Sequence, residues 1–170
     1  VLTGYFLLRK HRRASNLFLT LASLVFYAWG EPKFVFVMMA SIVVNWLFGL
    51  WVDRVRENRR AARGAVALMV VFNLSLLGVF KYLTFLLTNV RSWFGLSFPI
   101  PHIALPIGIS FFTFQAMSYV IDVYRGDGRV QKSLVNVCLY ISFFPQLIAG
   151  PIVRYQTVAD EIEGRRETLP

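Results

Sequence analysis

The sequence ALPIGISFFTFQAMSYVIDVYRGD at residues 104–127 and the sequence FFPQLIAGPIVRY at residues 143–155 decide how the whole chain is interpreted. Each is a long apolar run that also carries polar residues, together with proline or glycine where an ordinary membrane-spanning helix has neither. Inside a bilayer, irregular backbone is tolerated only where protein buries it or where it lines a wet cavity. The two runs therefore indicate the working part of a membrane protein, and we expect the upstream residues to form its scaffold.

The composition is not that of an ordinary soluble domain. Of the 170 residues, 56% are hydrophobic and 16% are charged, and the mean hydropathy is +0.57, whereas soluble domains have about 25% charged residues. The formal net charge is +9. Lys and Arg nevertheless occur in short clusters between apolar runs, which is typical of membrane proteins rather than of a nucleic-acid-binding face. We therefore expect no nucleic-acid partner. The single cysteine, Cys138, is interpreted as a small buried hydrophobic residue.

The spacing of apolar segments predicts an all-α fold of polytopic transmembrane helices. A spanning helix needs about 20 mostly apolar residues, and we expect residues 1–170 to form a single integral membrane domain. Pro145, Gly150 and Pro151 predict a broken or re-entrant helix near the C-terminal end. Because the chain starts inside an apolar run and ends just after a polar segment has begun, we expect it to be a fragment of a longer protein. The apolar segments are expected at about 1–8, 17–30, 34–52, 64–90, 103–121 and 133–153.

The charges of the loops predict the orientation in the membrane. Basic loops at 9–13, 53–63 and 122–132 alternate with poorly charged loops at 31–33 and 91–102. Since Lys and Arg accumulate on the cytoplasmic side, the three basic loops are expected there, in a multi-pass protein of the inner (cytoplasmic) membrane. The side on which the tail after residue 153 lies is left open by the broken helix.

Small and polar residues recur every four positions in the third apolar segment. Ser41, Asn45 and Gly49 share one face of the expected helix. Such a face lets membrane helices approach closely and hydrogen-bond to each other. We interpret it as a helix-packing face, with a role in substrate binding as the alternative.

A second polar face lies in the sequence at 104–127. Gln115, Ser118, Tyr119 and Asp122 are spaced by three, one and three residues, which places them on one side of a helix. Arg125 follows Asp122 by three residues, so the two can form an ion pair at the helix end. A structural ion pair and a polar lining of a substrate cavity are both compatible with this spacing.

The last apolar run carries Gln146 directly after Pro145, and Arg154 directly after a second break at Gly150 and Pro151. A broken helix exposes unpaired amides and carbonyls, and a nearby Arg can hold a carboxylate or a phosphate. A purely structural helix break is the alternative.

Familiar catalytic motifs are absent from the sequence. It contains no GxxxxGK[ST], GxGxxG, GxSxG, HExxH or CxxC pattern, so nucleotide, dinucleotide, serine-hydrolase and zinc chemistry have no support and no metal site is expected. His11 lies among basic residues and His102 follows Pro101 in a loop. Neither has the enclosed apolar setting of a catalytic imidazole.

The sequences at 104–127 and 143–155 closely resemble the membrane-bound O-acyltransferase (MBOAT) family, in particular its alginate O-acetyltransferase branch. ASLVFYAWGEPKF at 22–34 and FKYLTF at 80–85 are similar to the same branch, so the resemblance covers nearly the whole chain. It implies the N-terminal part of a membrane enzyme that transfers an acetyl or other acyl group to hydroxyls of a cell-envelope polysaccharide. A non-catalytic membrane scaffold or a transporter segment is the alternative, because hydropathy does not separate these classes.

The resemblance also implies which parts of the reaction this chain supplies. The catalytic histidine of the family lies downstream of the matching region, so the chain is expected to be inactive alone. An acyl donor, either acetyl-CoA or a carrier-linked acyl group, is implied as co-substrate, with no bound cofactor. The implied partners are the lipid bilayer, the polysaccharide acceptor and other envelope acylation proteins. The residues expected to bind substrate or line the tunnel are Gln115, Tyr119, Asp122, Arg125, Gln146, Gly150, Pro151, Arg154 and Tyr155.

Overall fold

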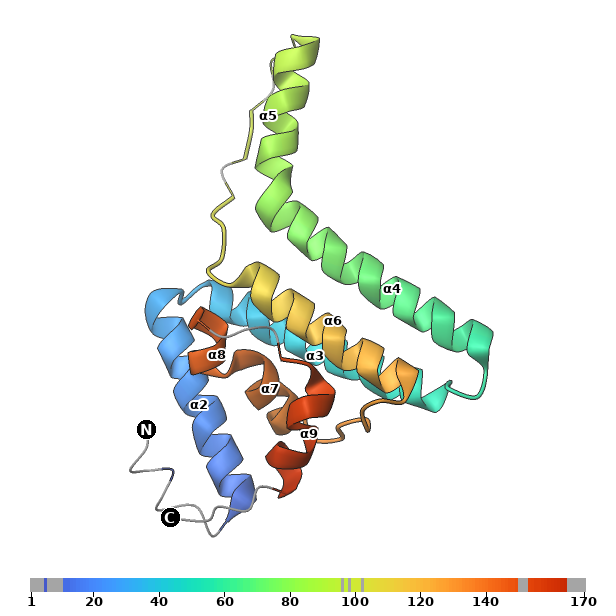
Figure 1. The fold of residues 1–170 in the computed structure, drawn as a ribbon. Coiled ribbons are helices and arrows are strands. Elements are labelled where there is room, and N and C mark those ends of the chain that lie inside the picture. Colours follow the sequence, from blue (N-terminus) through green and yellow to red (C-terminus); the bar gives the residue numbers. More distant parts are fainter. Residues whose placement is uncertain are drawn as a thin grey trace.

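A computed structural model of the chain describes Tyr5 and residues 11–95, 97, 99–101, 103–149 and 153–164. Within these ranges the fold is all-helical and contains no strand, as the sequence predicts. The expected segment at 1–8 lies outside the described residues apart from Tyr5. The helices, labelled as in Figure 1, are α2 (Arg12–Gly30), α3 (Phe34–Arg54), α4 (Arg59–Leu77), the π-helical turn η1 (Gly78–Tyr82), α5 (Leu83–Phe94), α6 (Ile109–Arg125), α7 (Leu134–Ser142), α8 (Phe144–Ala149) and α9 (Tyr155–Gly164).

Helices α3 and α6 lie side by side at the centre of the bundle, and α4 packs against both (Figure 1). Helices α2 and α7 form a second pair next to α3. The predicted packing face of α3 is confirmed, because Ser41, Asn45 and Gly49 are all buried. Gly49 allows α6 to approach α3 closely, since a Cβ atom at this position would lie only 2.6 Å from Cε1 of Tyr119 on α6.

Helix α6 is shifted toward the C-terminus relative to the predicted segment at 103–121. It runs from Ile109 to Arg125 between Gly108 and Gly126, and both glycines have left-handed backbone angles (φ 74° and 82°) that only glycine adopts at little cost. Pro106 lies upstream of the helix and restricts the backbone before it to extended conformations. The main-chain carbonyl of Asp122 accepts hydrogen bonds from the amides of Gly126, Asp127 and Gly128, and these bonds close the end of the helix.

Helices α4 and α5 form one continuous helical run that is bent at η1 (Figure 1). The run starts earlier than predicted because the side chain of Asn58 accepts hydrogen bonds from the amides of Arg60 and Ala61, which caps the helix N-terminus. Its 36 residues correspond to about 54 Å of helix, whereas the hydrocarbon core of a bilayer is about 30 Å thick. The bend directs α5 away from the rest of the bundle, so its side chains are largely exposed.

The predicted break in the last apolar run is present within the described residues, two positions before Pro145. Helix α7 ends at Ser142, Phe143 has non-helical backbone angles, and α8 begins at Phe144. Pro145 therefore lies in the first turn of α8, where its missing N–H is not needed by the helix. The second predicted break, at Gly150 and Pro151, lies outside the described residues.

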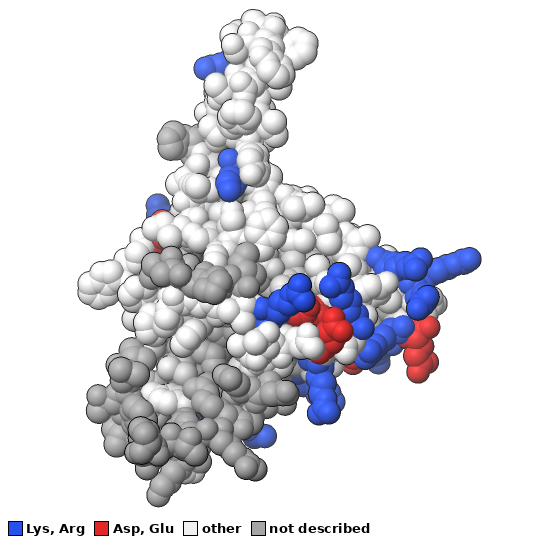
Figure 2. All heavy atoms as spheres, in the orientation of Figure 1, with Lys and Arg blue, Asp and Glu red and all other residues white. Residues whose placement is uncertain are grey.

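Much of the outer surface is apolar. Trp29, Phe36 and Trp93 are 90%, 75% and 78% exposed, which is the pattern of a surface in contact with lipid or with more protein. By length and apolar composition, two of the described helical runs can cross a membrane, Phe34–Arg54 and Arg59–Phe94. Figure 2 shows Lys and Arg gathered on one side of the molecule, over the link between α3 and α4 and the C-terminal end of α6.

Candidate functional site

The polar face of α6 is buried and binds three segments from the C-terminal part of the chain. Gln115, Tyr119 and Asp122 are all at most 5% exposed. Nε2 of Gln115 donates a 2.6 Å hydrogen bond to the carbonyl of Tyr140 on α7. The hydroxyl of Tyr119 accepts a 3.2 Å hydrogen bond from the amide of Gln131. The prediction that these residues share one helix face is thus correct, but the face is occupied by protein.

Three tyrosines from separate helices form a cluster beside this face. The rings of Tyr119 and Tyr155 meet edge to face at 4.9 Å between centroids, and those of Tyr140 and Tyr155 do so at 5.3 Å. Such tilted pairs are favourable because the positive edge of one ring faces the negative face of the other. The hydroxyl of Tyr140 also donates a 2.7 Å hydrogen bond to the carbonyl of Val153. The cluster therefore fixes the start of α9 against α6 and α7.

Asp122 binds α9 rather than its own helix neighbour. Its Oδ2 accepts a 3.3 Å hydrogen bond from the amide of Gln156, in the first turn of α9. The predicted ion pair with Arg125 is not formed in the structure, where Arg125 is exposed. Asp122 is buried and Arg125 is exposed, although three residues are only about 60° apart around the helix. A carboxylate at a helix N-terminus also has favourable main-chain donors, which makes the ion pair unnecessary.

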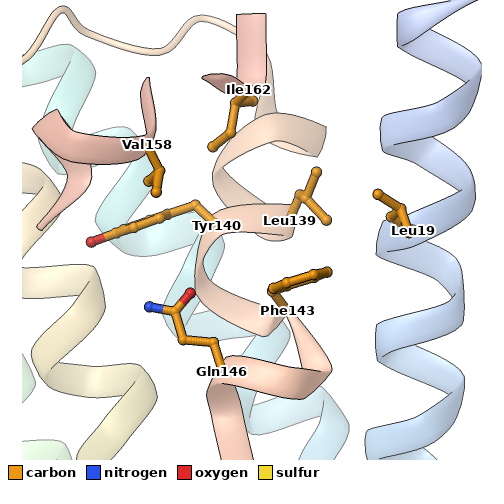
Figure 3. A pocket seen from close by; sticks show the side chains of 7 residues that line it. All are labelled: Leu19, Leu139, Tyr140, Phe143, Gln146, Val158 and Ile162. Carbon is orange, nitrogen blue, oxygen red and sulfur yellow. The ribbon is translucent and has the colours of Figure 1, made fainter. Parts of the chain in front are cut away.

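A cavity of about 320 Å³ adjoins the tyrosine cluster. This volume is within the range of small-molecule sites, about 300–1,000 Å³. Figure 3 shows side chains from α2, α7, α8 and α9 around it, with the amide of Gln146 directed toward Tyr140. Its lining residues are Leu19, Leu139, Tyr140, Phe143, Gln146, Val158 and Ile162.

The cavity is chemically suited to holding an apolar group beside a single amide. Apart from the phenol of Tyr140, which is bound to Val153, Gln146 is the polar member of its lining. None of these residues titrates near neutral pH. The cavity can therefore bind and orient a ligand, but its described lining supplies no general base.

The other predicted site residues, and the two histidines, have different positions in the structure. Tyr155 is buried in the tyrosine cluster, as described above. Arg154 is exposed just before α9, so its side chain is not part of the cavity. Gly150 and Pro151 lie outside the described residues. His102 lies outside them as well, and His11 is exposed. Among the residues that the structure describes, no three His, Cys, Asp or Glu side chains come together as a metal site.

Two members of the buried network were not singled out from the sequence, Tyr140 and Gln131. A tyrosine inside an apolar run signals a hydroxyl that needs a partner, so Tyr140 could have been found. Gln131 carries no such signal. Gln131 lies in the link between α6 and α7, whose contacts helical periodicity does not predict. Its carbonyl accepts a 3.0 Å hydrogen bond from Trp46 Nε1, and its side chain accepts one from the amide of Ser133 at 3.1 Å.

In the N-terminal half of α6, two buried side-chain oxygens have no hydrogen-bond partner: Oγ1 of Thr113 and Oε1 of Gln115. Buried polar atoms are nearly always paired, with protein or with ordered water. The two oxygens are therefore exceptions among the buried polar atoms of α6.

Comparison with known proteins gives related sequences but no related structure. No family model matched the chain, and no solved structure matched it significantly. Probable alginate O-acetylases AlgI of Pseudomonas aeruginosa and Azotobacter vinelandii are each 40% identical to it over 161 residues, which is 92% of this chain. A peptidoglycan O-acetyltransferase of Helicobacter pylori is 32% identical over 189 residues and covers 95% of the chain. The chain spans only 31%, 32% and 36% of the length of these three relatives.

Proposed function

The chain belongs to the alginate O-acetylase branch of the membrane-bound O-acyltransferase family, and on this premise we propose that it forms part of a membrane O-acyltransferase. The proposed reaction transfers an acetyl or other acyl group to hydroxyls of a cell-envelope polysaccharide. The observation that carries the proposal is the similarity to alginate and peptidoglycan O-acetyltransferases over more than nine tenths of the chain.

The cavity beside Tyr140 and Gln146 has a defined role in this proposal. Acyl transfer requires the acceptor oxygen to lose its proton as it attacks the acyl carbonyl, which needs a general base. Since the described lining contains no such base, we place the base in the part of the full-length protein that this chain does not span. The Gln146 amide can orient either an acceptor hydroxyl or the acyl carbonyl, because it offers both donors and an acceptor.

The buried network of α6 would act as the rigid support of this cavity. Gln115, Tyr119 and Asp122 hold α7, the link before it and α9 in place, and catalytic positioning is sensitive to shifts of about 1 Å. We therefore assign these residues and Tyr155 to positioning. Arg125 and Arg154, which are exposed, together with Gly150 and Pro151, remain candidates for contact with substrate in the complete enzyme.

The membrane arrangement and co-substrates are part of the same proposal. The apolar exterior fits a bilayer, and we propose a multi-pass protein of the inner membrane in which α7 and α8 form a re-entrant segment, because their apolar helices are short and broken at Phe143. Acetyl-CoA or a carrier-linked acyl group would be the donor. Other envelope acylation proteins would deliver or receive the group.

Replacing Gln146 tests the assignment. In the full-length protein, we expect Gln146→Leu to lower the acetyl ester content of the envelope polysaccharide by about tenfold, since it removes a hydrogen bond to the reacting groups. The amount of folded protein in the membrane should stay the same. The readout is acetate released from isolated polysaccharide by mild alkali.

The matched control is Gln156→Leu. The side chain of Gln156 is exposed, and the residue contacts Asp122 through its main-chain N–H, which the substitution keeps. This variant should keep the normal acetyl content. Equal losses of acetylation and of membrane protein in Gln146→Leu would indicate a folding role and count against a substrate site.

A further inference from the structure

A second and larger cavity, of about 760 Å³, opens where α2 and α7 begin. It lies outside the tyrosine cluster and shares only Ile162 with the first cavity. Its described lining contains three cationic side chains, Arg12, Arg13 and Lys132, and no carboxylate. The remaining lining residues are Asn16, Leu17, Gln131, Ser133, Val135, Asn136 and Ile162.

Helices α2 and α7 run in the same direction, so their N-termini meet at this cavity. Near the start of both helices, Nδ2 of Asn16 donates a 3.0 Å hydrogen bond to Oδ1 of Asn136. Further along, the amide of Phe144 donates a 3.4 Å hydrogen bond to the hydroxyl of Ser23. Two helix N-termini therefore direct their positive dipole ends and free amides to one region.

Neither N-terminus is neutralised by its own sequence. His11 precedes α2 and Ser133 precedes α7, and neither side chain caps its helix. The first turns of both helices contain no acidic residue. The positive charge around this cavity thus comes from three side chains and two helix ends together, and no described lining residue offsets it.

We propose that this cavity binds a phosphate group. Guanidinium groups match phosphate with paired hydrogen bonds, an ammonium adds a point charge, and main-chain amides at helix N-termini complete such sites. The side chain of Asn136, held by Asn16, supplies a further amide beside the cations. The phosphate comes either from the headgroup of an anionic phospholipid or from a soluble phosphate ester. The proposal does not depend on the acyltransferase function.

Binding to the purified full-length protein distinguishes the two sources. One arm measures the thermal unfolding midpoint with phosphatidylglycerol titrated into micelles. The reference is zwitterionic phosphatidylcholine, whose phosphate is balanced by its own ammonium group so that the lipid has no net charge. The other arm titrates inorganic pyrophosphate. We expect at least one anion to raise the midpoint, and the triple variant Arg12→Gln, Arg13→Gln, Lys132→Gln to weaken its apparent affinity by about tenfold or more. A response to phosphatidylglycerol alone identifies the lipid source, and a response to pyrophosphate alone identifies the soluble source.

The control variant carries Arg59→Gln, Arg60→Gln and Arg63→Gln, which remove the same charge from the start of α4, outside this cavity. It should bind like the unchanged protein. Equal weakening in both triple variants, or no response to either anion, overturns the proposal.

A third variant keeps the test valid if the triple variant folds poorly. Ser133→Asp places a carboxylate at the N-cap of α7, which should raise the midpoint without ligand because Asp caps helices well. The same carboxylate should abolish the increase caused by the anion, since it lies in the cavity lining. A Ser133→Asp protein that still responds fully to the anion contradicts the phosphate site.

Discussion

At the scale of single residues, Tyr119 connects three parts of the chain that are distant in sequence. Its ring contacts Tyr155 edge to face, its hydroxyl accepts a hydrogen bond from the amide of Gln131, and Gly49 leaves the space into which the ring fits. The side chain is fully buried. A change at any of these positions should therefore be transmitted to the others through the position of one ring.

Gly49→Ala tests how tightly this ring is held. The added Cβ would lie 2.6 Å from Cε1 and 2.7 Å from the hydroxyl oxygen of Tyr119, so the ring or helix α3 must move. We expect the free energy of unfolding to fall by about 1–3 kcal/mol, the usual cost of overpacking a core. The measurement is a denaturing-detergent titration of the purified full-length protein.

Gly64→Ala is the matched control. A Cβ at Gly64 in α4 would meet no atom within 4 Å, and Ala is preferred over Gly inside helices by about 1 kcal/mol. The control should leave the protein equally stable or slightly more stable. If both variants lose the same stability, the space around Tyr119 is not the cause.

The residues of the α6 face were predictable, but their partners were not. Helical periodicity places Gln115, Tyr119 and Asp122 on one side. Their partners follow at separations of 25, 12 and 34 residues, and no local pattern specifies which distant segment will fill the face. The same limit explains Arg125: spacing allowed an ion pair, whereas the packing of α9 gave the Asp122 carboxylate a different donor.

At the scale of elements, a reciprocal pair of amides joins α3 to α4. Nδ2 of Asn45 donates to Oδ1 of Asn73 at 3.1 Å, and Nδ2 of Asn73 donates to Oδ1 of Asn45 at 2.8 Å. Each Nδ2 also donates to a carbonyl one turn back in its own helix, at Ser41 and at Met69. Both residues are fully buried, so the amide donors are satisfied without water.

Replacing one asparagine should lower the free energy of unfolding by more than half of the loss caused by replacing both. Asn45→Leu leaves the Asn73 amide buried without its partner, and we expect a loss of about 1–2 kcal/mol in the free energy of unfolding. In the double variant Asn45→Leu, Asn73→Leu, no orphaned amide remains, so the loss should be smaller than the sum of the two single losses. Detergent titrations of the four proteins give the coupling energy directly.

Asn89→Leu is the control for this cycle. Its Nδ2 donates only within α5, to the carbonyl of Phe85, and no second helix depends on it. Its effect should be within about 0.5 kcal/mol. Strictly additive losses for Asn45 and Asn73 would show that the pair does not couple α3 to α4.

The elements themselves were largely predictable, and their ends less so. The apolar run at 34–52 predicted nearly the whole of α3, because Pro32 precedes the run and basic residues follow Val52. The basic loop predicted at 53–63 was too long, since the Asn58 cap starts α4 within it. The break in the last run was predicted from Pro145, but the chain turns at Phe143, because a proline is best accommodated inside the first turn of the next helix.

At the scale of the whole molecule, the orientation predicted from the loop charges stays a prediction, and the structure shows where two of the basic loops lie. The link between α3 and α4 and the C-terminal end of α6 carry the gathered Lys and Arg side chains in Figure 2, and α5 extends from the other side of the bundle in Figure 1. The basic loops at 53–63 and 122–132 thus lie on the same side of the bundle. Alternating membrane crossings require basic loops to share one side, which labelling can test.

Labelling of single cysteines in intact cells tests this orientation. In a full-length protein whose native cysteines are replaced, Cys138 included, cysteines are introduced at four exposed positions: Lys33, Glu57, Ser97 and Asp127. A charged maleimide does not cross the bilayer. Lys33→Cys and Ser97→Cys should therefore be labelled from outside, whereas Glu57→Cys and Asp127→Cys should react only after the cells are opened.

The pair Glu57 and Ser97 carries the most information, because only the α4–α5 run and a few loop residues separate them. The run is about 54 Å long if straight, which exceeds the bilayer core, and η1 bends it at Gly78–Tyr82. If Ser97→Cys is labelled from outside and Glu57→Cys is not, the run crosses the membrane once and α5 emerges beyond the hydrocarbon core. If Ser97→Cys is protected like Glu57→Cys, the chain turns back at η1, and the alternation predicted from the basic loops is wrong from that helix onward.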